Sequence, residues 1–481
     1  TAVAILLIPA SSYDSLPKEI REEKQDQRFS HSSGSVDTPS WKINDRWVYD
    51  GELDVYDFIA SSGVSTNVNT LTGTLDVQVT DILLIDIGGV QTIAYEATGQ
   101  GDYRADNIQL EGQNGDIIVE METVSLIRAS DMAIISQTAT IDIEFDGPWW
   151  VCLLISCDIA SITAANEYWP PLERHDFPMY VGDSWVNDYT VNTTYSGSSA
   201  YVDIPQDSSE QVETTSTVVQ AGYPGVSHSG CAVSYNVTAT DVNGSIVGYG
   251  WHCDSIGNDV LTLNEVTLGL MAEHEIQFSS LAFRSTEVHV GLGYPLSPFN
   301  LESPIWVNVT DSSGTPMQDT DVDIRYDATG FATTVTTASN GSAFLSLDYG
   351  ANGDDSYVVG EHGSHGILAI VGTDNIGVST VTLDPDIHEV DLKLESVSIS
   401  VERNRSDSIE TIPSPYDAVP GDIITISVPI VNDGLMQASS GFVEAFGSNT
   451  GAIGSEPFPS LPSLGTYVAN FEWTVPEIMG N

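Results

Sequence analysis

Ile43-Asn44-Asp45-Arg46-Trp47-Val48 recurs as Val181-Gly182-Asp183-Ser184-Trp185-Val186, and each copy opens a strand-like run after a turn. Downstream, Tyr95-Glu96-Ala97-Thr98 recurs as Tyr235-Asn236-Val237-Thr238. Each tyrosine follows its tryptophan at nearly the same distance, 48 residues from 47 to 95 and 50 residues from 185 to 235. Two motifs in the same order at matched spacing predict that a β unit has been duplicated.

The duplication predicts two antiparallel β domains, residues 37–165 and 166–300, each within the usual size range of a domain. We expect the repeated aromatic residues, Trp47, Trp185, Tyr95 and Tyr235, to be core anchors. Large aromatic side chains are mostly buried, and a buried indole N–H needs one hydrogen-bond partner. A ligand-stacking role for Trp47 or Trp185 is the alternative interpretation.

The composition predicts an all-β, multidomain protein. Val, Ile, Thr and Tyr are plentiful, turns rich in Gly, Ser, Asn and Asp separate the apolar runs, and no long stretch has helical periodicity. With 481 residues and 41% hydrophobic content, the chain is long enough for roughly three or four domains that each bury a core.

Acidic residues dominate the charge. The chain has 68 Asp and Glu against 14 Lys and Arg, a formal net charge of −54. Nucleic acid and anionic lipid both require a basic surface, so the charge excludes them as partners. After Lys42 the only lysine is Lys393, and low Lys with high Asp resembles the proteins of salt-exposed archaea. Simple solubility through like charge is the alternative explanation.

The N-terminal residues 1–12 read as the remnant of a signal peptide or membrane anchor, because their apolar run is too short to span a bilayer. A strand buried in the fold is the third interpretation. Residues 13–36 are polar and predict a flexible leader. Together with the abrupt C-terminal end, these features predict a fragment of a longer, exported protein at the cell surface.

Four cysteines fit an oxidising, extracellular compartment. Cys231 and Cys253 flank two strand-like runs joined by an Asn-Gly turn, and Cys152 and Cys157 would close a small loop. Two local disulfides are therefore expected. The alternative is a zinc site formed by Cys231 and Cys253 with His228 and His252, because zinc takes nitrogen and sulfur ligands.

The third predicted module covers residues 301–390. Ile305–Val309 reads as a strand, Asp311–Pro316 as a turn, and Thr337-Ala-Ser-Asn-Gly-Ser-Ala-Phe344 as the start of a later strand. This layout resembles bacterial Ig-like and transthyretin-like modules. The resemblance implies a β-sandwich of about 85 residues and is silent on ligand.

The fourth predicted module covers residues 391–481. Its motifs are Pro420-Gly421-Asp422, then Val431-Asn432-Asp433-Gly434, then Phe471-Glu-Trp473-Thr-Val475-Pro476. They resemble the CARDB family, an adhesion-associated β-sandwich of bacteria and archaea. The resemblance implies a spacer or binding unit of a surface protein. The closing strands of the family are missing, which predicts a truncated module.

Cation binding has weak support, and we expect no cofactor. The best Ca²⁺ candidate is a loop with four oxygen-bearing side chains, Asp348, Asn352, Asp354 and Asp355. The series Asp319, Asp321, Asp323 begins like an EF-hand but lacks its later Gly and Glu, so it reads as a strand with a carboxylate face. His362 and His365 lack a third ligand nearby and read as a solvated loop.

No catalytic constellation is present in the sequence: it contains no G-x-S-x-G elbow, P-loop or dinucleotide fingerprint. We therefore expect cell-surface adhesion or structural display, with other surface proteins, glycans or a second copy as partners. Membrane contact would come only through an anchor outside the chain. The alternatives are a binding protein whose repeats are half-barrels around an apolar ligand or polymer, and the non-catalytic part of a secreted hydrolase.

The distributed charge predicts that salt stabilises the protein broadly. Counter-ions screen the repulsion among carboxylates, which otherwise opposes the compact state. The melting temperature should therefore rise as NaCl is added, and this is measured by following thermal unfolding at several salt concentrations. A melting temperature that falls with added salt would contradict the prediction.

Overall fold

The computed structural model describes most of the chain, and its two compact units, residues 1–20 with 384–481 and residues 21–383, are treated separately. The described residues are 3–9, 36–55, 65–150, 152, 156–200, 204–222, 228, 230–267, 270–293, 296–297, 302–349, 363–383, 390, 392–394, 398–405, 408–412, 419–432, 434, 437–447, 451–462 and 465–475. The fold is all-β, as expected. Within the described ranges no helix is long and apolar enough to cross a membrane.

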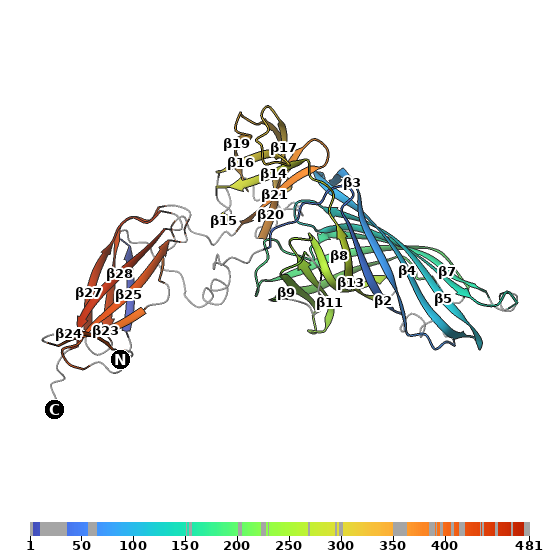
Figure 1. Ribbon diagram of the computed structural model, residues 1–481, viewed down its shortest axis with the longest axis horizontal. Helices are drawn as coiled ribbons and strands as arrows, with labels where there is room; N and C mark the ends of the chain where they lie inside the picture. Colours follow the sequence, from blue (N-terminus) through green and yellow to red (C-terminus); the bar gives the residue numbers. More distant parts are fainter. Residues whose placement is uncertain are drawn as a thin grey trace. The chain divides into compact units, whose positions relative to one another are not determined.

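The larger unit contains a closed barrel of twelve strands, β2 to β13, in which neighbouring strands are antiparallel (Figure 1). β13 pairs with β2 from Met271↔Asp54 to Ser280↔Arg46 and so closes the sheet. The strands are β2 (Arg46–Asp54), β3 (Thr70–Ile87), β4 (Val90–Leu110), β5 (Gln113–Arg128), β6 (Ile134–Asp146), β7 (Asp158–Leu172), β8 (Ser184–Ser199), β9 (Ser208–Gly222), β10 (Ser234–Asp241), β11 (Ile246–Cys253), β12 (Asn258–Thr267) and β13 (Leu270–Ser280).

Residues 37–165 and 166–300 are therefore not separate domains, which corrects the expectation from the sequence. Each contributes about half of one barrel, β2–β7 and β8–β13, and the expected boundary at 165 falls inside β7. Either half alone would be an open sheet with two edges of unpaired backbone groups. Pairing β7 with β8 and β13 with β2 removes both edges of each half.

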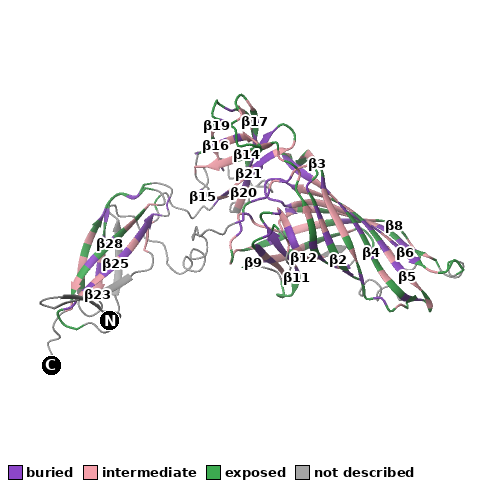
Figure 2. Ribbon diagram, viewed as in Figure 1, coloured by how far each residue is buried: buried purple, intermediate pink, exposed green. Residues whose placement is uncertain are grey.

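Alternation along the strands separates the barrel interior from its surface (Figure 2). On β5, Val119 and Met121 are buried, whereas Glu120 and Glu122 are exposed. Successive side chains of a strand point to opposite faces of the sheet, so the acidic residues reach water while the apolar ones line the inside. The exposed carboxylates follow from the same two-residue period that forms the core.

The repeated motif adopts the same turn in both halves. In the first copy the backbone N–H of Lys42 donates to Asp45 Oδ2 at 2.8 Å, and Val79 N–H donates to Asp45 O at 2.9 Å. In the second copy Tyr180 N–H donates to Asp183 Oδ2 at 2.8 Å, and Val218 N–H donates to the Asp183 carbonyl at 2.9 Å. Both turns therefore fix where the second strand of each half pairs with the first.

The residue before each aspartate has a positive φ, 77° at Asn44 and 101° at Gly182. Asn and Gly tolerate this conformation better than other residues do. The same turn occurs at Gly421-Asp422 in the smaller unit, where φ of Gly421 is 90° and Val419 N–H donates to Asp422 Oδ2 at 2.9 Å. The Asn/Gly-Asp dipeptide is thus a register device that the protein uses three times in its described part.

The expected core anchors lie in or against one hydrophobic cluster. Trp47 and Tyr95 are fully buried and Tyr235 is nearly so, while Trp185 is half-buried and packs against the cluster. The indole N–H of Trp47 donates to Ile256 O at 3.1 Å, and that of Trp185 donates to Glu173 O at 3.0 Å. Each indole therefore has the single partner that burial demands.

A two-sheet sandwich follows the barrel within the larger unit. One sheet contains β14 (Thr286–Leu292), β16 (Glu302–Asp311) and β19 (Ser342–Asp348). The other contains β15 (Leu296–Ser297), β17 (Asp321–Tyr326), β18 (Phe331–Thr336), β20 (Gly363–Val371) and β21 (Asn375–Leu383). Side chains from both sheets share one core. The sandwich begins at β14 rather than at residue 301, because β14 pairs with β16 and not with the barrel.

The sandwich and the barrel are joined by buried contacts. Leu368, Ile370 and Ile376 belong to the same hydrophobic cluster as Trp47. The hydroxyl of Thr92, on β4, donates to the carboxylate of Asp327, which follows β17. Lys42 Nζ lies 3.4 Å from Asp374 Oδ2. These contacts make one body of the barrel and the sandwich.

The smaller unit also has two sheets around one core. One contains β22 (Leu392–Leu394), β23 (Ser398–Arg405), β24 (Ser408–Ile412), β25 (Ile423–Asn432) and β28 (Thr466–Thr474). The other contains β1 (Val3–Pro9), β26 (Gly441–Gly447) and β27 (Gly451–Phe458). β1 pairs with β26 from Val3↔Gly447 to Pro9↔Gly441, so residues 3–9 form a strand of this unit. Of the expected leader, residues 13–36, only Val36 lies within the described residues, where it is buried and pairs with Met179.

The two copies of the turn are expected to differ in their contribution to stability. Asp45 is fully buried, accepts a hydrogen bond from Ala282 N–H at 2.7 Å and pairs with Arg284 at 3.0 Å, whereas Asp183 is only half-buried. Asp45→Ala should lower the free energy of unfolding by about 3 kcal/mol, because Arg284 loses its buried partner. Asp183→Ala should cost about 1 kcal/mol, as for one lost hydrogen bond. Urea unfolding measures both, and equal losses would contradict the prediction.

Candidate functional site: a cavity inside the barrel

The barrel encloses a cavity of about 680 Å³, which lies between two hydrophobic clusters. Trp41 and Val237 of the first cluster line it, and so do Met121 and Ala272 of the second. The lining residues follow the inward period of each strand. On β8 every second residue from 187 to 195 faces the cavity: Asn187, Tyr189, Val191, Thr193 and Tyr195.

The two halves of the barrel line the cavity differently. The lining residues between 41 and 172 include no Asp, Glu, Lys, Arg or His, and many are apolar: Leu75, Val77, Ala97, Met121, Ile127, Ile134 and Leu172. The charged residues and histidines of the described lining all come from positions 174 to 274: Arg174, His175, Glu210, Glu213, Asp241, Asp259 and His274. The cavity therefore has an uncharged side of mixed apolar and polar residues and a second side that also carries ionisable groups.

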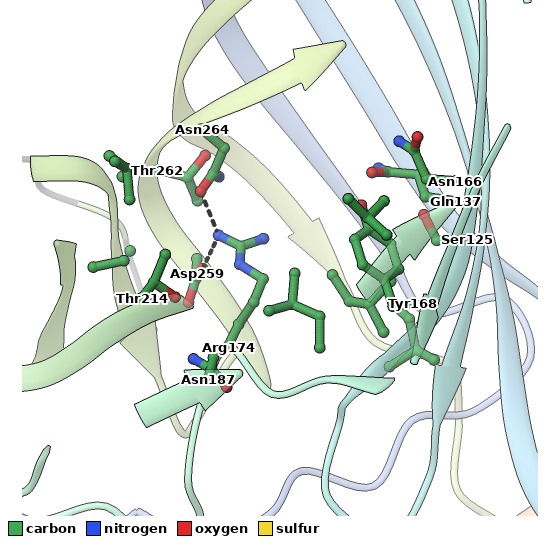
Figure 3. Close-up of a pocket in the computed structure, with 18 of the residues that line it drawn as sticks. Ser125, Gln137, Asn166, Tyr168, Arg174, Asn187, Thr214, Asp259, Thr262 and Asn264 are labelled. Atoms are coloured by element: carbon green, nitrogen blue, oxygen red, sulfur yellow. Dashed lines mark hydrogen bonds and ion pairs between the residues drawn. The ribbon is translucent and has the colours of Figure 1, made fainter. Parts of the chain in front are cut away.

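Arg174 is the only basic side chain of the described lining and is held by polar partners. Its guanidinium donates to Asn264 Oδ1 at 2.8 Å and lies 3.9 Å from Asp259 Oδ2 (Figure 3). Figure 3 shows Ser125, Gln137, Asn166 and Tyr168 across the cavity from this group. The cation is therefore fixed at the polar side and partly neutralised there.

Asp259 faces two histidines. His175 Nε2 lies 3.2 Å and His252 Nδ1 lies 3.4 Å from the same oxygen, Asp259 Oδ1. The aspartate and His252 are buried, and the side chain of His175 is 12% exposed. The ligand-capable atoms of the three side chains all lie within 4.8 Å of one another. Three groups able to bind a metal or carry a proton thus meet at the cavity wall.

The electrostatics of this cluster favour an ionised carboxylate beside an uncharged imidazole. Burial alone would raise the pKa of Asp259, but His175, His252 and Arg174 outweigh it and hold the pKa well below its usual range. Burial lowers the pKa of His175, against the opposing pull of Asp259.

Local sequence explains how the three side chains meet. His252 is the last but one residue of β11 and Asp259 is the second residue of β12, and the two are direct partners across this hairpin. Its turn contains Gly257 at φ 68°. A Cβ atom at Gly250 would lie 2.6 Å from Asp259 Oδ2, so the glycine leaves room for the carboxylate. His175 comes from the connection between β7 and β8 and stacks on Phe177, with ring centroids 5.6 Å apart.

A third histidine lies elsewhere in the cavity wall. His274 Nε2 is 2.6 Å from the hydroxyl of Tyr103, and both side chains are buried. Burial lowers the pKa of His274 to about 4. Gly51 provides the space, because a Cβ there would lie 2.7 Å from the Tyr103 ring and 2.9 Å from the His274 ring.

The sequence-predicted site residues mostly lie away from this cavity. Trp47, Trp185, Tyr95 and Tyr235 are outside its lining, whereas Trp41, which the sequence analysis did not single out, lines it. Cys231 is bonded to Cys253 and Cys152 to Cys157. Sulfur atoms in disulfides are not thiolate ligands, so the zinc site with His228 is excluded. The two disulfides indicate an oxidising environment.

The calcium candidates gain no support in the described part of the chain. Asn352, Asp354 and Asp355 lie outside the described residues, and Asp348 ends β19. His362 is also outside, while His365 lies on β20. Asp321 and Asp323 are exposed on β17 and accept hydrogen bonds from Thr336 and Thr334 of β18, at 2.7 and 2.6 Å, which fits a carboxylate face of a strand.

Sequence reasoning missed His175, Asp259 and Arg174. His252 was considered only with its neighbouring cysteine. The available signal was weak: a glycine at 250, two residues before a histidine, and a second histidine between prolines at 171 and 178. Because 77 residues separate His175 from His252, only the closure of the barrel brings them together.

Comparison with known proteins does not assign the chain to a family. No family model matches it, and no curated protein matches it. One solved structure similar to the chain is a beta-barrel-like protein of the domain of unknown function DUF1849 from Brucella abortus, at 9% sequence identity and a TM-score of 0.26. The match covers 51% of this chain and 100% of that chain. A TM-score this low does not relate the two folds.

His274 predicts a pH dependence of stability. The pKa of His274 is about 4 in the folded protein and 6.5 without burial, which is the value expected in the unfolded chain. Between pH 6.5 and pH 4 the unfolded chain therefore carries a proton on His274 that the folded protein lacks. This contribution to stability is complete above pH 6.5 and is lost as the pH falls towards 4. Between pH 7 and pH 4 the free energy of unfolding of the wild type should fall by roughly 3 kcal/mol more than that of His274→Gln. Urea titrations at both pH values measure this, and parallel pH profiles would contradict it.

Proposed function

We propose that the barrel is a ligand-binding domain of an exported protein, and that its cavity holds one small amphipathic molecule. The observation that carries the proposal is the cavity of about 680 Å³, within the range of 300–1,000 Å³ typical of small-molecule sites. A binding protein with half-barrels around a ligand was one expectation from the sequence, and an unfilled interior supports it.

The lining supports a ligand with two chemically different ends. The uncharged side from residues 41–172 offers an apolar surface, and the side from residues 174–274 offers hydrogen-bonding and charged groups. A molecule with both an apolar and a polar part would bury its apolar surface favourably while keeping its polar atoms paired.

The charge of the lining supports a cationic or neutral polar end. Against the single Arg174 stand four carboxylates, from Glu210, Glu213, Asp241 and Asp259. Tyr168 and Tyr189 also face the cavity, with ring centroids 5.7 Å apart, and aromatic faces attract cations. An anionic headgroup would meet both the lining carboxylates and the net charge of −54.

Cell-surface adhesion or display is the second candidate function. The two-sheet units at residues 286–383 and 384–481 each have a core of their own, and none of their described residues lines the cavity. Such sandwiches suit spacers and contact surfaces, with other surface proteins, glycans or a second copy of this chain as partners. The resemblance of these units to Ig-like and CARDB modules is part of this second proposal.

The cavity is tested with two dansyl-labelled probes of equal chain length, an alkylamine and a fatty acid. The amine should bind with a stoichiometry of one per chain and a blue-shifted emission, at least about tenfold more tightly than the acid, which is about 1.4 kcal/mol. Fluorescence titration gives both dissociation constants. Tighter binding of the fatty acid, or no binding of either probe, would contradict the proposal.

Neighbouring positions on β5 provide a matched pair of variants. Ser125 lines the cavity, whereas Val124 is 41% exposed. Ser125→Trp should fill part of the cavity and weaken amine binding at least tenfold, and Val124→Trp should leave it unchanged. Circular dichroism and thermal unfolding confirm that both variants fold. Equal effects of the two substitutions would place the probe on the outer surface.

A further inference from the structure

Three side chains at the polar side of the cavity are arranged as metal ligands are. His175 Nε2 and His252 Nδ1 lie 3.2 and 3.4 Å from Asp259 Oδ1. Two ligand atoms bound at about 2.0–2.1 Å to one tetrahedral ion lie about 3.3 Å apart. The two nitrogen-to-oxygen distances therefore equal those of ligands that share an ion. All three ligand atoms lie within 4.8 Å of one another.

Although both histidines contact Asp259 Oδ1, well-formed hydrogen bonds do not satisfy every buried polar atom of the cluster. Among the described residues, neither Asp259 Oδ1 nor His252 Nε2 has a hydrogen-bond partner, although both atoms are inaccessible to solvent. Asp259 and His252 are only 4% and 3% exposed. Leaving a buried carboxylate oxygen and an imidazole nitrogen unpaired is costly, and a bound cation would remove that cost.

Neighbouring residues position the carboxylate of Asp259. Arg174 approaches the other oxygen, Asp259 Oδ2, at 3.9 Å and is anchored by Asn264, so Oδ1 is left to the histidines. Gly250 leaves space beside the carboxylate, where a Cβ would lie 2.6 Å from Oδ2. His252 adjoins Cys253, whose disulfide with Cys231 restrains the end of β11. Outer contacts of this kind orient metal ligands.

We propose that His175, His252 and Asp259 form a binding site for one divalent transition-metal ion of the zinc class. Two imidazoles and one carboxylate suit Zn²⁺ and its neighbours, whereas Ca²⁺ and Mg²⁺ prefer sites made of oxygen. Three protein ligands leave a fourth position for water or for a donor atom of a bound molecule. His175 and Asp259 both line the cavity, so this position is open to it.

The full-length protein, first treated with EDTA and dialysed, is titrated with Co²⁺ as a spectroscopic probe and with Zn²⁺ by calorimetry. We expect one Co²⁺ per chain with the intense visible bands of a tetrahedral site, and displacement of Co²⁺ by Zn²⁺. Excess Mg²⁺ and NaCl suppress weak binding to surface carboxylates. Weak bands typical of octahedral Co²⁺ only, or no saturable binding, would overturn the proposal.

Variants locate the ion. His175→Gln and Asp259→Asn should each weaken Zn²⁺ binding at least about 100-fold and abolish the tetrahedral spectrum, a loss beyond that of an outer-shell change. His274→Gln is the matched control, because this histidine lines the same cavity but contacts Tyr103 instead. Thermal unfolding verifies that each variant folds. If Asp259→Asn does not fold, His175→Gln decides alone, since its side chain is the most exposed of the three.

Retention of wild-type Zn²⁺ affinity in His175→Gln, or its loss in His274→Gln, would contradict the assignment. The metal is measured without any organic probe, and the dansyl amine is measured in EDTA. Failure of one binding reaction therefore leaves the other proposal standing.

Discussion

The hydrogen bonds around Asp45 and Asp183 set the register on which the barrel depends. Each aspartate caps its own turn through Oδ2 and accepts, at its carbonyl, an N–H from the neighbouring strand. Side chains in a strand alternate with a period of two, so a shift by one residue would turn every inward side chain outward. Trp47 and Tyr49 would leave the core, and outward residues of the same strand such as Asp50 and Glu52 would enter it. The cavity and the acidic surface are consequences of one register.

That register also makes the high charge tolerable. In a closed barrel with a two-residue period, the outward positions can carry Asp and Glu while the inward ones stay mostly neutral, as Glu120 and Glu122 show beside Val119 and Met121. Every barrel strand except β11 carries Asp or Glu, and the carboxylates at outward positions face solvent, where water and counter-ions screen their repulsion. We expect the charge to disfavour nucleic acid as a partner, but it does not define a binding site by itself.

The sequence was sufficient for everything that depends on local pattern. Alternation predicted an all-β fold, the Cys231 and Cys253 positions predicted their pairing, and the repeated Asp-x-Trp motif predicted equivalent turns. The closure of the barrel could not be predicted from the sequence. It depends on the pairing of residues 271–280 with residues 46–54, and no local sequence pattern identifies these two strands as partners. The sequence did not predict the pairing of β1 with β26 for the same reason, because its partner is distant along the chain and a short apolar run is typical of both a signal segment and a strand. His252 and Asp259 meet locally across the β11–β12 hairpin, but His175 joins them only in the folded barrel, so sequence spacing could not reveal the three together.

The two halves of the barrel share a turn and a strand count but have different interiors. The described lining from residues 41–172 has no Asp, Glu, Lys, Arg or His, whereas the lining from residues 174–274 has all of those in the described lining. If the halves arose by duplication, closure required only that both keep the Asp turn and the inward period, because these fix the strand pairing. The inward residues themselves were free to diverge. A barrel of two identical halves would present the same surface on both sides of its cavity, whereas this one sets an uncharged wall against Arg174, His175 and Asp259. If the cavity binds a molecule as we propose, this asymmetry would favour an orientation that places the charged or most polar part of the molecule at the second half.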